Sequence, residues 1–170
     1  MKKTIKNIVA VILFLVVALC GVLVLPKAAV SAKAAGGAAI EVTSSLTDIK
    51  TNAAGQEFTV SATVKNNTGT DMYNAQIKIS FDVNYFEFVE HVPSPDIRNS
   101  ILFVPESNAA EGYITLMGDD KDEPISKTQW KIGSIKLKLK NGVTPSAGMA
   151  SAITSSDSIL CDMIGNEVEH

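Results

Sequence analysis

The stretch Glu57-Phe58-Thr59-Val60-Ser61-Ala62-Thr63-Val64-Lys65 has an apolar residue at every second position. Successive side chains of a strand point to opposite faces, so this alternation predicts a strand with one face on a core and one in water. The turn-forming residues 66–69, Asn-Asn-Thr-Gly, follow directly. The alternation then resumes over 74–81, where alanine, isoleucine and phenylalanine take every second position. The two segments predict two strands separated by a turn.

Further strands are marked by the same alternation or by short apolar runs between turn residues. We expect strong strands at 86–89, 101–104, 113–117 and 130–140, and weaker ones at 40–46, 149–154 and 158–163. Within 130–140 the apolar positions change register at Gly133, which predicts a β-bulge there. Eight or nine short strands without a helical period predict an all-β fold, a two-sheet antiparallel β-sandwich.

The alternation also predicts which side chains form the core between the two sheets. These are the inward-facing apolar positions of four strands: Phe58, Val60, Ile77, Ile79, Phe81, Phe88, Ile135, Leu137 and Leu139.

The N-terminus predicts export. Three lysines within residues 2–6 precede an uncharged apolar run of 18 residues, 8–25, and Ala32-Lys33-Ala34 fits a signal peptidase site. The same run reaches the lower limit for a membrane-spanning helix, so an uncleaved anchor is the alternative. A lipid anchor at Cys20 is disfavoured because Leu19 is not the small residue that a lipobox needs. Either main interpretation places the rest of the chain outside the cytoplasm, in the extracellular space or at the cell surface.

We therefore divide the chain into a signal peptide or membrane anchor (1–34), a short spacer (35–39) and one domain (40–170). Removal of residues 1–34 leaves 136 residues, enough for one domain with its own core. It also removes five lysines and no acidic residue, which leaves 10 basic and 18 acidic residues, a net charge of −8. Nucleic acid is excluded as a partner because its phosphates require a basic surface.

The chain offers little chemistry for catalysis. Cys161 is the one cysteine after residue 34, which excludes a disulfide within the chain and a cysteine-based zinc site. His91 and His170 are the two histidines, and no nucleophile elbow, zinc-protease helix or P-loop motif occurs. The sequence therefore predicts a protein that is not an enzyme.

The order of elements resembles a cohesin domain, within the superfamily that also holds the family-2 and family-3 carbohydrate-binding modules. The segments that carry the resemblance are Gly55–Val60, Val64–Asn66, Ile77–Asp82, Phe86–Val89, Gly112–Ile114, Ile132–Lys140 and Asp157–Val168. They span about residues 40–168, and they are packing patterns rather than catalytic signatures. The resemblance implies a jelly-roll sandwich that binds a dockerin-type domain in polysaccharide degradation or cell-surface assembly.

The same resemblance implies where the partner binds. In cohesins the strand that matches 74–82 presents its polar face to dockerin, and that face here carries Asn74, Gln76, Lys78 and Ser80. Asn74 matches a position that is often asparagine in scaffold-type cohesins. Gln76 stands where such cohesins often have an acidic contact residue. A solvent-facing strand carries polar residues in any case, so the alternative interpretation of all four is simple exposure.

Two other binding chemistries remain open. Stacking of a sugar ring could use the aromatic residues Tyr73, Tyr85, Tyr113 and Trp130, as in a module that binds polysaccharide directly, although core packing is the favoured explanation for most of them. A calcium ion could use the acidic run Asp119, Asp120, Asp122 and Glu123, but its spacing fits no EF-hand loop, and we expect a solvated loop without a cofactor. A purely structural cell-envelope module is the third interpretation.

Overall fold

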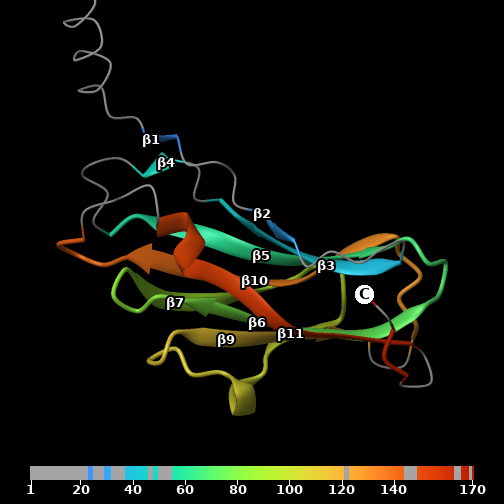
Figure 1. The fold of residues 1–170 in the computed structure, drawn as a ribbon. Helices are drawn as coiled ribbons and strands as arrows, with labels where there is room; N and C mark the ends of the chain where they lie inside the picture. Colours follow the sequence, from blue (N-terminus) through green and yellow to red (C-terminus); the bar gives the residue numbers. More distant parts are fainter. Residues whose placement is uncertain are drawn as a thin grey trace, which may run out of the picture.

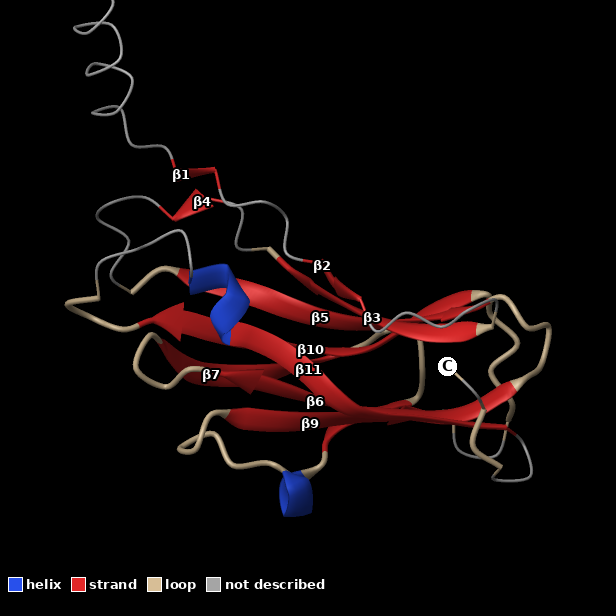
Figure 2. Ribbon diagram, viewed as in Figure 1, coloured by secondary structure: helices blue, strands red, loops and turns tan. Residues whose placement is uncertain are grey.

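In the computed structural model the chain folds into two antiparallel β-sheets packed face to face (Figures 1 and 2). The structure describes residues 23–24, 29–31, 37–45, 48–49, 55–120, 123–143, 149–162, 166–168 and 170. Most of the predicted leader, 1–34, which we expect to begin with a signal or anchor helix, therefore lies outside the described residues; 23–24 and 29–31 are short strands. Nowhere in these ranges is there a helix of the length and apolarity that a membrane crossing requires.

The first sheet has five strands in the order β2-β3-β5-β10-β7. Its strands are β2 (Ala29–Ser31), β3 (Ala38–Ser44), β5 (Glu57–Asn66), β10 (Gln129–Leu139) and β7 (Phe86–Pro93). The second sheet has four strands in the order β11-β6-β9-β8. Its strands are β11 (Ile153–Asp162), β6 (Met72–Phe81), β9 (Tyr113–Asp119) and β8 (Asn99–Leu102). These nine strands confirm the predicted β-sandwich.

Two further short strands and two 3₁₀ turns complete the described elements. The pair β1 (Leu23–Val24) and β4 (Asp48–Ile49) stands apart from both sheets. The turn η1 (Val104–Glu106) follows β8, and η2 (Met149–Ala152) leads into β11. Residues 149–152 are thus a 3₁₀ turn, and the prediction of a separate strand at 149–154 was wrong. The weak strand predicted at 158–163 is the second half of β11.

The core lies between the sheets and uses the predicted alternation. Eight of the nine predicted core side chains are at most 5% exposed: Phe58, Val60, Ile77, Ile79, Phe81, Ile135, Leu137 and Leu139. The ninth, Phe88, is half-buried at the edge of the core, because β7 is the outermost strand of its sheet. Trp130 is 1% exposed and belongs to the same core.

The bulge predicted at Gly133 is confirmed. The pairing of β10 with β5 shifts register between Lys131 and Gly133. A Cβ atom at Gly133 would lie 2.9 Å from the Ser100 hydroxyl of β8 and 3.2 Å from His91 Nε2 of β7, so these two side chains would have to move to admit a larger residue. The bulge returns Ile135 to the core side after Ile132 and lets both parts of the strand bury their apolar residues.

Candidate partner-binding surface

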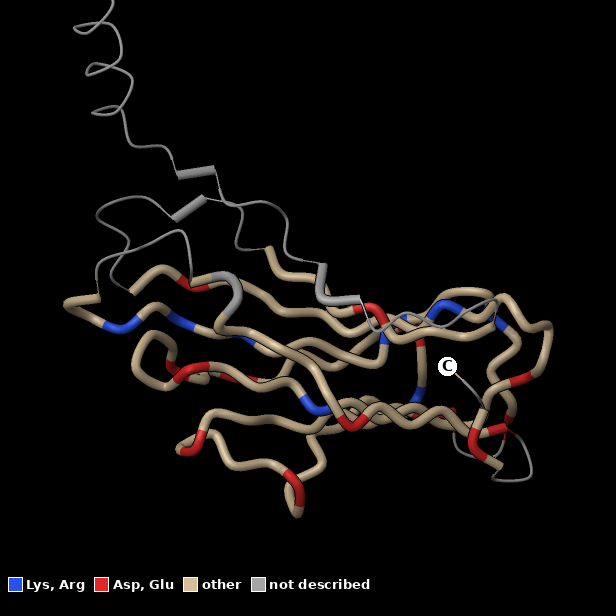
Figure 3. The backbone as a smooth tube through the Cα atoms, in the orientation of Figure 1, with Lys and Arg blue, Asp and Glu red and all other residues tan. Residues whose placement is uncertain are grey.

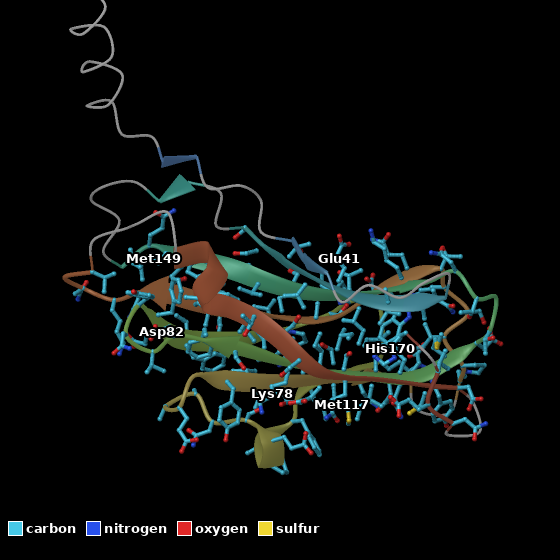
Figure 4. All side chains as sticks on the ribbon, viewed as in Figure 1. Glu41, Lys78, Asp82, Met117, Met149 and His170 are labelled. Atoms are coloured by element: carbon cyan, nitrogen blue, oxygen red, sulfur yellow. The ribbon has the colours of Figure 1, made fainter. Side chains whose placement is uncertain are left out.

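The four polar residues predicted on β6 lie on the side of the four-stranded sheet that points away from the core. Their neighbours Ala75, Ile77 and Ile79 are fully buried, whereas Asn74, Gln76, Lys78 and Ser80 are half-exposed. Figure 4 shows Lys78 and Met117 together on this side, away from the five-stranded sheet. We call this surface the β6 face, and it includes the outward residues of β9 and β11, which pair with β6, and of β8, which pairs with β9.

An apolar row crosses the β6 face at right angles to the strands. Gln76 lies opposite Met117 of β9 on one side and opposite Ile159 of β11 on the other, and Met117 lies opposite Ile101 of β8. Directly paired residues of antiparallel strands project to the same face. Ile101 is 41% exposed and Ile159 is 37% exposed. The four strands therefore present three apolar side chains and Gln76 in one line.

The loop that contains η1 borders this row. Thr115 of β9 is only 1% exposed because its hydroxyl donates to the Glu106 carbonyl (2.7 Å) and its N–H donates to the Ser107 hydroxyl (2.9 Å). Val104, at the start of the turn, is 69% exposed. The loop thus adds an exposed apolar side chain shortly after β8, and hydrogen bonds hold the loop to β9.

Two of the predicted polar residues already have partners on the face. Gln76 Nε2 donates to Glu106 Oε2 at 2.9 Å. Lys78 Nζ lies 3.5 Å from Asp157 Oδ2 and 4.7 Å from the centroid of the Tyr113 ring. Asn74 pairs in register with Asp119 and Cys161, and Ser80 with Tyr113 and Thr154. All four predicted residues therefore share one face, but they differ in what they offer to a partner.

Sequence reasoning missed the residues that other strands and loops contribute to this face: Ile101, Val104, Glu106, Met117, Asp157 and Ile159. One signal was present. The run Ile101-Leu102-Phe103-Val104 is apolar without alternation, which indicates a strand with apolar residues on both faces. The position of Asp157 carried no signal, because it depends on a bulge in β11 between Ser156 and Ile159.

The four aromatic residues considered for sugar stacking do not form one platform. Trp130 is buried and its ring is covered by the core. Tyr85 packs against the core, with its ring 6.2 Å from that of Phe86. Tyr113 lies under Lys78, and Tyr73 is at the opposite end of β6 from the Ser80–Tyr113 pair. The structure therefore offers no row of exposed aromatic rings on the strands that it describes.

The acidic run considered for calcium is largely engaged by protein groups. Asp119 Oδ1 accepts from Asn99 Nδ2 at 2.6 Å. Asp120 accepts from the Arg98 N–H at 3.0 Å, and Glu123 Oε2 lies 3.0 Å from Arg98 Nη2. Asp122 lies outside the described residues. Among the residues described, no group of three His, Cys, Asp or Glu side chains is placed to hold a metal ion.

A polar cleft of about 330 Å³ lies at the turn between β5 and β6. Its deepest residue, Asn66, is 4% exposed and uses its side-chain amide to hold the Thr68 N–H and hydroxyl and the Thr70 carbonyl. The rest of the lining is Asn67, Gly69, Thr70, Asp71, Ser126 and Thr128. A lining without apolar or aromatic walls is unlike most ligand pockets, so the β6 face is the stronger candidate site.

Two comparisons connect the chain to known proteins. The sequence model of the cohesin domain matches residues 42–163. The fold is similar to the third cohesin of ScaC from Acetivibrio cellulolyticus in complex with the ScaB dockerin, with a TM-score of 0.56, 15% identity, and 69% of this chain and 83% of that chain covered. It is also similar to type II cohesin A11 from Bacteroides cellulosolvens, with a TM-score of 0.55, 12% identity, and 69% and 84% covered.

A third similar structure is the cohesin in the Coh-OlpA–Doc918 complex from Clostridium thermocellum, with a TM-score of 0.53 and 15% identity. That match covers 68% of this chain and 82% of the other. At sequence identities this low, the similarity to these structures shows the fold alone. No curated protein sequence matches the chain.

Proposed function

Because the cohesin model matches most of its length, the chain belongs to the cohesin family, and from this premise we propose that it is a non-catalytic module that docks a dockerin-type domain through the β6 face. The observation that carries the proposal is the row Ile101–Met117–Gln76–Ile159. The row crosses β6, the strand that the family resemblance assigns to the partner, at Gln76. An exposed apolar row with polar neighbours is typical of a protein-binding surface.

We propose that the module acts outside the cell. The lysines before the apolar run at 8–25 favour export, with the chain either released or held by an uncleaved anchor. A module of this kind would recruit dockerin-bearing enzymes of polysaccharide degradation, or assemble proteins at the cell surface. Net negative charge keeps such a module soluble and away from nucleic acid.

The β6 face is suited to docking because it is a rigid sheet. Strands that are paired on both sides present their side chains with little ordering cost when a partner binds. Apolar residues in the middle of the face exclude water, and the surrounding polar residues set the register of the partner.

Retention of calcium-loaded dockerin domains by the immobilised module tests the proposal, with a panel taken from the organism's own enzymes. We expect at least one dockerin to bind. The double variant Asn74→Ala, Gln76→Ala should lose that binding while its unfolding midpoint stays close to that of the wild type, because surface changes usually alter stability by less than about 0.5 kcal/mol. The matched control is Thr59→Ala, Thr63→Ala, which removes polar side chains from β5 in the other sheet.

Three outcomes contradict the proposal in different ways. If a dockerin binds the double variant as tightly as the wild type, the β6 face is wrong and the loops become the candidates. Retardation in a polysaccharide gel without dockerin binding would instead support direct polysaccharide recognition. A module that retains neither is a structural one.

A further inference from the structure

The amide of Gln76 has a fixed orientation. Its Nε2 donates to Glu106 Oε2 at 2.9 Å, across from β6 to the turn η1. The nitrogen and oxygen of an amide sit on the same carbon, so a nitrogen that points to Glu106 turns Oε1 to another side. Gln76 therefore offers an acceptor rather than a donor to a molecule that approaches the β6 face.

Lys78 is held by the Asp157 carboxylate, as Gln76 is held by that of Glu106. Lys78 Nζ lies 3.5 Å from Asp157 Oδ2, and the Asp157 side chain is 67% exposed against 34% for Lys78. Asp157 has a φ of 49°, a left-handed conformation that aspartate adopts more readily than most residues. This conformation accompanies the bulge between Ser156 and Ile159, where β11 passes Lys78. The bulge thus places an exposed carboxylate beside the lysine.

The polar groups that remain for a partner are therefore rich in acceptors. They are the Gln76 carbonyl and the carboxylates of Glu106 and Asp157, and they lie next to the apolar residues Met117 and Ile159. Acidic residues mark both the η1 loop and the middle of β11 in Figure 3. A partner that also presents acceptors or negative charge would be repelled, whereas a partner with donors or positive charge would be attracted. The β6 face therefore discriminates between partners by charge.

We propose that Glu106 determines specificity on the β6 face, and that the partner carries lysine or arginine side chains around an apolar strip. This inference rests on the docking function proposed above. Gln76 stands where cohesins often have an acid, and Glu106 restores the missing charge from the adjacent loop while it fixes the Gln76 amide. Glu106 thus supplies the negative charge and Gln76 supplies the uncharged acceptor, and the hydrogen bond between them couples the two side chains.

Four variants test this division, with affinity measured by calorimetry for a dockerin that the wild type retains. Glu106→Ala removes the charge and frees the amide, and it should weaken binding about tenfold. Glu106→Gln can still accept from Gln76, and it should weaken binding less, by about threefold. The double variant Gln76→Glu, Glu106→Ala moves the charge to β6 and should return to within about threefold of the wild type. Glu87→Gln makes the same charge change on the other sheet and should bind as the wild type does.

The outcomes separate this inference from the proposed function. Unchanged affinity of Glu106→Ala overturns the role of Glu106, and so does a double variant that stays as weak as Glu106→Ala. Affinity that is the same at low and high salt overturns the cationic partner, because screening weakens charge pairs. If the wild type retains no dockerin at all, the docking function fails, and the specificity of this face fails with it.

Discussion

A larger residue in place of Gly112 would be unfavourable for two separate reasons, backbone strain and a steric clash. Its φ is +85°, and a Cβ atom there would lie 2.2 Å from the backbone oxygen of Phe81. Its own carbonyl accepts the N–H of Phe81 at 2.7 Å, which holds the two backbones together. A neighbouring side chain could rotate away, but a backbone atom of a central strand cannot.

We predict that Gly112→Ala destabilises the fold by more than the cost of a positive φ. Gly142 supplies the control because its φ is +80° and nothing lies within 4 Å of an added Cβ. Gly142→Ala should cost about 1 kcal/mol from backbone strain alone. Gly112→Ala should cost several times as much in urea unfolding. Equal losses for the two variants would show that the Phe81 carbonyl moves away easily.

His91 is the residue whose protonation should affect stability near neutral pH. Its Nε2 is buried without a hydrogen-bond partner, and burial lowers its pKa below the ordinary value of 6.5. The unfolded chain therefore takes up a proton at a higher pH than the folded chain does. Stability should be complete above about pH 6.5 and should fall as the pH drops toward the folded-state pKa, with a slope of at most about 1.4 kcal/mol per pH unit.

Urea midpoints between pH 8 and pH 5.5 measure this effect in the wild type and in His91→Gln. We expect the midpoint of the wild type to decrease over this range and that of the variant to change less. A pH slope that is identical in the two proteins would remove His91 as its cause.

At the scale of elements, β6 carries both the core and the candidate site on alternate residues. Phe81 is 5% exposed on the core side, and Ser80, the preceding residue, is half-exposed on the β6 face. Phe81→Ala should cost about 3–5 kcal/mol, as truncation of a buried phenylalanine does. Ser80→Ala should change the free energy of unfolding by less than about 0.5 kcal/mol. If the costs were reversed, the two faces of β6 would have to be exchanged.

The strands and their buried faces could be predicted because alternation is a local property. The segment 57–65 is β5, and the register change at Gly133 was visible as a change in which positions are apolar. The candidate site could be predicted only for β6. The other contributors reach the β6 face through pairing between distant segments, as Ile101 does with Met117 and Ile159 with Gln76. Such pairing is set by the packing of the whole sandwich, and no short segment records it.

At the scale of the whole molecule, most segments meet through contacts between residues that are far apart in sequence. β5 and β10 pair along most of their lengths although more than sixty residues lie between them. Such a fold must close long loops before its contacts form, and β-sandwiches consequently fold slowly. The order of strands within the sheets depends on pairing between distant segments. The sequence alone therefore predicts the fold class more readily than the strand order.

The position of β2 within the predicted leader means that cleavage of the leader would change the edge of the five-stranded sheet. Residues Ala29, Val30 and Ser31 pair with Thr43, Val42 and Glu41 of β3, so β2 covers the outer edge of the five-stranded sheet. Cleavage after Ala34, as the sequence predicts, would remove this cover. We predict that a chain that begins at Ala35 exchanges the β2-facing amides of residues 41–43 faster than the full chain does, as measured by hydrogen–deuterium exchange. Equal rates would show that β2 gives the edge no protection.

A precursor and its processed form would then differ in what they expose to other extended chains. An uncovered strand edge is a template for further strands, and proteins usually shield it. In the folded precursor β2 would shield this edge, and removal of residues 1–34 would leave β3 as an exposed edge strand that can pair with another extended chain.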